Sequence, residues 1–103
     1  MDDFQWLDAT AQAELVRAGD VTARELVDAA ITRIEALNPT LNAVITTRFD
    51  GARTSADAPP TGAPFPGVPF LLKDCVAQSA GDPYHCGMRV LRDAGWTSDH
   101  DTE

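Results

Sequence analysis

The 103-residue chain is predicted to adopt an α/β fold with an incomplete sheet. Two amphipathic helical patterns open the chain, two short apolar runs follow them, and another helical pattern lies near the end. Helices that alternate with strands are typical of α/β sandwiches. Two strands are too few for a stable sheet with both faces covered. We therefore expect part of a longer fold, helical over residues 8–38 and α/β over residues 42–95.

The front of the chain carries helix signals at both ends of two segments. Asp8–Ala18 begins with a capping residue, and Gly19 stands where helices commonly end. Thr22-Ala23-Arg24-Glu25 has the spacing of a capping box, and Ala23–Leu37 carries an apolar stripe at helical spacing. Asn38-Pro39 is predicted to stop this second helix, because the residue before proline avoids the helical conformation.

The rest of the chain is predicted to contain two strands and two more helices. Asn42–Thr47 is rich in β-branched residues and bounded by turn residues, so it is predicted to be a strand. A short helix is expected across Arg48–Asp57, followed by a proline-rich loop over Ala58–Pro66. Val68–Leu72 is nearly all apolar, as buried parallel strands are. A last helix is expected over Tyr84–Ala94.

Composition and charge exclude several kinds of protein. The net charge of −8 argues against binding to nucleic acid or to an anionic membrane surface. No apolar stretch approaches the roughly 18 residues of a membrane span, and the acidic start lacks the features of a signal peptide. Two cysteines are too few for a secreted disulfide framework. We therefore expect a reduced, cytoplasmic protein that binds neither nucleic acid nor membrane.

Lys73 is the single lysine of the chain, and it ends the apolar run Gly67–Leu72. Burial in apolar surroundings lowers the pKa of an amine and makes it usable as a base. The alternative is a surface lysine that ends a strand and reaches water. Asp74 follows at once, but neighbouring residues on a strand point to opposite faces. We therefore expect the Asp74 carboxylate to bond backbone or water.

The serines do not form a recognisable nucleophile turn. Ser55 lies in the expected short helix, Ser79 follows the second expected strand, and Ser98 lies in a polar tail. None has the Gly-x-Ser-x-Gly pattern that would expose a nucleophile. We expect solvated or capping roles for all three.

Cysteine and histidine side chains suggest a metal site, but their spacing argues against one. Zinc sites need three or four ligands, often in C-x₂₋₄-C or H-x₃₋₅-H spacing. His85 and Cys86 are adjacent, and neither Cys75 nor His100 completes such a pattern. No metal is expected, and Cys75 is interpreted as a buried structural thiol.

The segment Pro66–Asp74 resembles the lysine-bearing segment of the amidase signature hydrolases. Three further stretches have the order and spacing of that family's N-terminus: Asp8–Arg17, Asn38–Ile45 and Ser98–Asp101. Within the family, the chain is most similar to the amidases that resemble 6-aminohexanoate cyclic-dimer hydrolase. The resemblance implies that residues 1–103 are the N-terminal part of a single amidase domain, an incomplete α/β/α sandwich.

The same resemblance implies a Ser–Ser–Lys arrangement with Lys73 as the general base. Both serines would lie downstream of this chain, so the 103 residues alone are expected to be inactive. A small-molecule amide is the implied substrate, no cofactor is expected, and the complete enzyme is expected to be a homodimer. Many members have asparagine at the position of Cys75, and the stretch Asp82–Met88 also departs from the family pattern.

Two other functions remain open from the sequence. One is an amidotransferase subunit of the same family, which releases ammonia from glutamine for a partner protein. The other is a non-catalytic acidic module that binds a partner helix through the apolar stripe of Ala23–Leu37.

Overall fold

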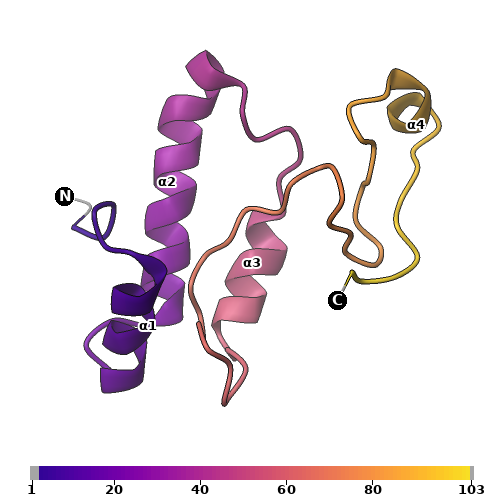
Figure 1. Ribbon diagram of the computed structural model, residues 1–103. Coiled ribbons are helices and arrows are strands. Elements are labelled where there is room, and N and C mark those ends of the chain that lie inside the picture. The colour runs from indigo at the N-terminus through magenta and orange to yellow at the C-terminus, as the bar shows by residue number, and fades with distance from the viewer. Residues whose placement is uncertain (1–2, 103) are drawn as a thin grey trace. The chain divides into compact units, whose positions relative to one another are not determined.

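The computed structural model describes residues 3–102, and the chain divides into two compact units after Pro69. Four helices lie in the described part: α1 (Ala9–Ala18), α2 (Ala23–Leu41), α3 (Phe49–Ala56) and α4 (Arg89–Asp93) (Figure 1). No strand occurs there, and the one isolated antiparallel bridge joins Pro83 to Thr97. The helices of the predicted α/β fold are therefore present in this structure, whereas its first strands are not.

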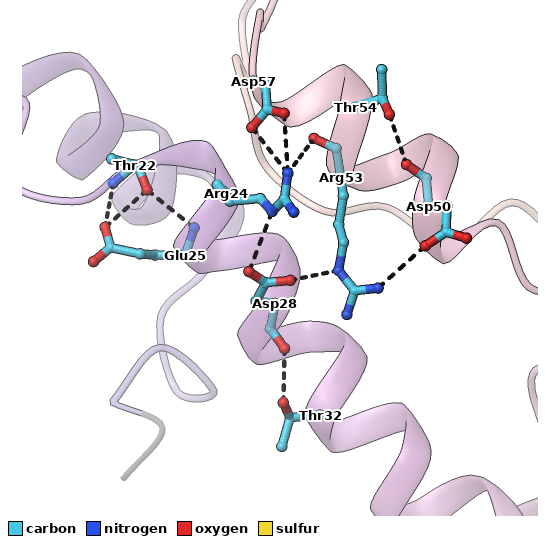
Figure 2. A network of polar contacts seen from close by, with 9 residues as sticks. All are labelled: Thr22, Arg24, Glu25, Asp28, Thr32, Asp50, Arg53, Thr54 and Asp57. Atoms are coloured by element: carbon cyan, nitrogen blue, oxygen red, sulfur yellow. Dashed lines mark hydrogen bonds and ion pairs between the residues drawn. The ribbon is translucent and has the colours of Figure 1, made fainter.

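The caps of α1 and α2 confirm the helix starts expected from the sequence. The Asp8 carboxylate accepts a hydrogen bond from the Ala11 N–H at 2.8 Å, and Gly19 ends α1 with a φ of 76°. In the capping box of α2, the Thr22 hydroxyl accepts from the Glu25 N–H at 3.1 Å. The Glu25 carboxylate in turn accepts from the Thr22 N–H at 2.8 Å (Figure 2). These bonds satisfy amides that have no partner inside the helix.

The end predicted for α2 was wrong, because the helix continues through Pro39 to Leu41. Proline lacks only its own N–H, so in the last turn it removes a single helical hydrogen bond. Asn42 then ends the helix in the left-handed conformation, with a φ of 50°, and donates its N–H to the Asn38 carbonyl at 2.7 Å.

Neither predicted strand forms within the described residues. In the segment predicted as the first strand, the Asn38 side chain pairs with the backbone of Val44 through two hydrogen bonds of 2.9 Å. In the second, Val68–Leu72, the side chains of Phe70 and Leu71 are 83% and 63% exposed. A strand needs a neighbouring strand to bond its N–H and C=O groups. Residues 3–102 supply no such neighbour to either segment.

The core of the first unit lies between α2 and α3, which lie side by side (Figure 1). The buried residues Ala23, Val27 and Ile31 recur every four positions along one face of α2. They meet Ala56 of α3, and Phe49 and Ala52 pack against the same cluster. The predicted short helix is thus confirmed, and it covers part of the apolar stripe of α2. Leu37, further along α2, remains 55% exposed.

Ion pairs join α2 to α3 at the edge of this core (Figure 2). The Asp28 carboxylate accepts from Arg53 Nε at 2.8 Å and lies 3.4 Å from Arg24 Nε. Arg24 Nη1 also contacts the Asp57 carboxylate at 3.0 Å, and Arg53 Nη1 lies 3.5 Å from Asp50. The hydrogen bond from Arg53 is the main cause that lowers the pKa of Asp28 from its ordinary 3.8.

Asp28→Asn is expected to reduce the stability of the protein in a pH-dependent way. The folded pKa of Asp28 lies below its unfolded value of 3.8. The stability that the ionised carboxylate adds is therefore complete above that value and is lost as the pH falls through the folded pKa. Urea unfolding midpoints at neutral and progressively lower pH should show the wild type and the variant converging. Asp20→Asn, which removes an exposed carboxylate with no hydrogen bond or ion pair in the described residues, is the control. A difference independent of pH would contradict the role assigned to the carboxylate.

Gly67 brings the end of the first unit against the start of α2. Its φ is 73°, and a Cβ placed on it would overlap the Cβ of Ala23. Gly67→Ala is therefore expected to destabilise the protein twice, by about 1–2 kcal/mol for the left-handed backbone and by about 1–3 kcal/mol for the overlap. Gly62→Ala is a matched control, because Gly62 has a φ of 78° but open space around it. Equal shifts in the urea midpoint of both variants would contradict the close packing at Gly67.

Candidate active site

Lys73 lies in the second unit, in a segment without regular secondary structure, and it is exposed. The apolar residues before it are exposed as well, Leu71 by 63% and Leu72 by 49%. The expectation of an amine held in a dry pocket is therefore not met within residues 3–102. The physical reason is that no described segment covers this run. Within the same residues, the amine of Lys73 has no hydrogen-bond or ion-pair partner.

Asp74 ties the Lys73 segment to a loop that comes later in the same unit. Its Oδ1 accepts a hydrogen bond from the His85 N–H at 2.7 Å, and its Oδ2 accepts from the Gly87 N–H at 3.3 Å. These backbone bonds lower the pKa of the Asp74 carboxyl, and the bond from His85 is the largest cause. The interpretation that Asp74 bonds backbone is confirmed.

The last helix is shorter than the sequence predicts. The helix predicted over Tyr84–Ala94 forms only as α4, Arg89–Asp93. Cys86 and Gly87 have φ values of 50° and 71°, which a right-handed helix does not allow, so the helix begins only after them.

Tyr84 makes a second hydrogen-bonded link, or tie, between these two segments. Its hydroxyl accepts a hydrogen bond from the Val76 N–H at 2.9 Å. Val76 has a φ of 76°, a conformation that β-branched residues rarely adopt, and this bond helps to hold it. A hydrogen bond with the thiol of Cys86 is the main cause that raises the pKa of Tyr84.

Cys75 is exposed, so its interpretation as a buried structural thiol was wrong.

None of the three serines forms a hydrogen bond with the amine of Lys73 in the described residues. Ser55 is exposed on α3, and the Ser79 hydroxyl donates to Asp82 Oδ2 at 2.6 Å. Ser98 is 4% exposed, so its expected solvated or capping role was wrong. The structure therefore brings no described serine into a hydrogen bond with Lys73.

Ser98 lies at the centre of a group of hydrogen bonds that the sequence analysis did not predict. Its hydroxyl oxygen lies 2.8 Å from Gln78 Oε1 and 2.9 Å from the His100 carbonyl oxygen, and its single proton is donated to one of these two acceptors at a time. On either side, the Thr102 hydroxyl accepts from the Gln78 N–H and Asp101 accepts from the Ala80 N–H. The polar tail is thus bonded to residues 78–82 through its backbone and side chains, while Asp99–Thr102 stay exposed. Polar composition alone gave no signal for this, because the bonds to Gln78 and Ala80 join residues about twenty positions apart in the chain.

The histidines make contacts of an ordinary structural kind. A ring nitrogen of His85 lies 3.2 Å from the Trp96 carbonyl, and His100 Nδ1 lies 2.6 Å from Asp99 Oδ1. Among residues 3–102, no three His, Cys, Asp or Glu side chains are grouped so that they could hold a metal ion. In the same part of the chain, no helix has both the length and the apolar character needed to cross a membrane.

Known proteins match most of this chain in sequence. A family model described as Amidase matches residues 25–101. The 6-aminohexanoate-cyclic-dimer hydrolase of Pseudomonas sp. (strain NK87) is 44% identical over 96 residues, which are 93% of this chain and 19% of the hydrolase. A glutamyl-tRNA(Gln) amidotransferase subunit of Alkalilimnicola ehrlichii is 39% identical over 85 residues, which are 77% of this chain and 17% of that relative. This chain thus spans about a fifth of the length of these relatives.

A solved structure agrees with the sequence comparison. The structure of 6-aminohexanoate cyclic dimer hydrolase in complex with substrate is 44% identical and has a TM-score of 0.84. The likeness covers 93% of this chain and 20% of the solved one. The family model covers Lys73, Asp74 and the loop that Asp74 binds. The chain therefore belongs to the Amidase family.

Proposed function

We propose that this chain is the N-terminal part of a serine-dependent amide hydrolase in which Lys73 is the general base. The observation that carries the proposal is the position of Lys73, the single lysine of the chain, inside the matched range 25–101. The Amidase family model and the 6-aminohexanoate-cyclic-dimer hydrolase relative support amide hydrolysis as the reaction class. We propose a small-molecule amide as the substrate.

The exposure of the Lys73 segment supports an active site that is shared with further polypeptide. Exposed Phe70, Leu71 and Leu72 lead directly to the amine, and burying such side chains stabilises a protein by about 1.5–3 kcal/mol each. In our proposal, polypeptide outside residues 1–103 covers this run and supplies two serines. A neutral lysine amine then accepts a proton from the first serine, which in turn accepts the proton of the second.

The second serine hydroxyl is the proposed nucleophile. As its proton leaves, its oxygen bonds to the amide carbonyl carbon, and the C–N bond breaks as the nitrogen is protonated. The product amine departs and an acyl-enzyme remains. Water then attacks the ester with the same base, which releases the acid and restores the serine hydroxyl. Backbone N–H groups are needed to stabilise the oxyanion in both steps.

A fluorophosphonate probe tests the proposal in the complete protein, because it reacts covalently with an activated serine hydroxyl. We expect one labelled serine outside residues 1–103, and loss of amide hydrolysis in proportion to labelling. Peptide mapping by mass spectrometry locates the label. The proposal would be wrong if the label lay on Ser55, Ser79 or Ser98, or if amide hydrolysis continued at full rate in the labelled protein.

A glutaminase of the amidotransferase type is a second candidate, favoured by the 39% identity to the amidotransferase relative. The two functions differ in the amide that is cleaved. Assays of ammonia release from glutamine and of amine release from linear and cyclic secondary amides separate them in the complete protein. Activity confined to glutamine would favour the glutaminase over the general amidase.

A further inference from the structure

Cys75 and Cys86 lie on two segments that the Asp74 carboxylate holds together. Cys75 directly follows Asp74 in the chain. On the opposite segment, the carboxylate binds the N–H groups of His85 at 2.7 Å and Gly87 at 3.3 Å. These two residues flank Cys86. The carboxylate next to one thiol therefore holds the backbone on both sides of the other.

A second tie lies on the other side of Cys75. Val76, the next residue, donates its N–H to the Tyr84 hydroxyl at 2.9 Å. Tyr84 stands two residues before Cys86, so this bond brings the segment of Cys86 to the residue next to Cys75. The amidase proposal assigns no role to either cysteine.

We propose that Cys75 and Cys86 form a reversible disulfide when the protein meets a low-molecular-weight disulfide such as oxidised glutathione. Both thiols are free in the structure; Cys75 is exposed and Cys86 is half-buried, so an oxidant reaches Cys75 first. A disulfide needs Cα atoms within about 4.4–6.8 Å of each other, which the two ties favour by holding the segments together. The bond would lie two residues from Lys73, but its formation does not depend on the amidase proposal.

The reaction proceeds by two thiol–disulfide exchanges. The thiolate of Cys75 attacks one sulfur of oxidised glutathione, and one glutathione thiolate leaves. The thiolate of Cys86 then attacks the Cys75 sulfur of the mixed disulfide, and the second glutathione thiolate leaves. Two protein thiols are oxidised, one glutathione disulfide is reduced to two thiols, and the two protons pass to the departing glutathione thiolates.

Peptide mapping of the complete protein identifies the bond directly. Trypsin cleaves after Lys73 and Arg89, so both cysteines fall in one peptide, Asp74–Arg89. After oxidation this peptide should be lighter by two hydrogens and should resist alkylation. Further cleavage by chymotrypsin after Tyr84 should leave two peptides that separate only on reduction. A mixed disulfide with glutathione on each cysteine, with no internal bond, would overturn the proposal.

The ratio of oxidised to reduced protein in glutathione buffers gives the effective concentration of one thiol at the other. Short flexible loops give values in the millimolar range, which is the expectation for the protein in urea. Because the ties restrict the two segments, we expect the folded protein to exceed the urea value by more than about tenfold. An equal or lower value in the folded protein would overturn the proposal.

A pair of variants isolates the ties. Tyr84→Phe removes the hydroxyl that binds Val76, and it should lower the effective concentration severalfold toward the value in urea. Asp101→Asn is the control, since Asp101 binds the Ala80 N–H elsewhere in the same unit, and it should leave the value unchanged. Circular dichroism verifies that both variants are folded. Equal values for Tyr84→Phe and the wild type would contradict the part assigned to the tyrosine.

Discussion

Lys73→Ala is expected to lower kcat/KM for amide hydrolysis by about 10²–10⁴-fold in the complete protein, the usual contribution of a general base. The physical reason is that Lys73 is the single lysine of the chain, so its loss removes the amine proposed to accept the serine proton. Lys73 is exposed and makes no hydrogen bond or ion pair within residues 3–102. Its removal breaks no described hydrogen bond or ion pair, so the variant should still fold. Turnover of a chromogenic amide and urea unfolding measure the two effects side by side.

Lys73→Arg separates a base from a simple positive charge. Arginine keeps the charge and a similar length but stays protonated in proteins, so it cannot accept the proton. We expect this variant to be as inactive as Lys73→Ala. Arg92→Ala, which removes an exposed cation paired with Asp93 in the same unit, is the control and should keep ordinary turnover. Full activity in Lys73→Arg would show that the residue contributes charge rather than proton transfer.

Leu26→Ala is expected to have the largest effect on stability. Leu26 on α2 is only 1% exposed and is the largest fully buried side chain among the described residues. Replacing a buried leucine by alanine removes apolar contacts and leaves a cavity, at a cost of about 2–5 kcal/mol. Urea unfolding followed by circular dichroism should show this cost as a lower midpoint.

Leu37→Ala is the matched control for Leu26→Ala. Both leucines lie on α2, and the two changes remove the same atoms at the same cost in helix propensity. Leu37 is 55% exposed, so its loss should change the stability by less than about 0.5 kcal/mol. A large effect at Leu37 would mean that further polypeptide covers this end of α2. Similar, small effects at both positions would contradict the burial of Leu26.

The helical half of the fold could be predicted from local signals. Asp8, Gly19 and the Thr22–Glu25 box act on backbone atoms within a few residues, and all three have the predicted role. The end of α2 could not be predicted in this way, because Pro39 is tolerated in a last turn that Asn42 then closes. Helix caps that involve residues within one turn were predicted correctly. The end of α2 was not, because it depends on residues after Asn38-Pro39.

The residues of the candidate site could be chosen from the sequence, but their contacts could not. The Lys73–Asp74 pair could be chosen because Lys73 is the single lysine of the chain and ends an apolar run. The bonds of Asp74 to His85 and Gly87 span more than ten residues, and no periodicity in the sequence indicates them. Ser98 was missed for the same reason, since its burial depends on Gln78, twenty positions earlier.

The sequence by itself determined the family, the helix caps and the identity of the candidate base, because each depends on residue types at short spacing. Only the tertiary structure decided the state of the predicted strand ending at Leu72 and the exposure of Lys73. Strand formation and burial both need a second segment, either to pair with backbone groups or to exclude water. Residues 3–102 provide that second segment for the helices α2 and α3 but not for the run that carries the lysine.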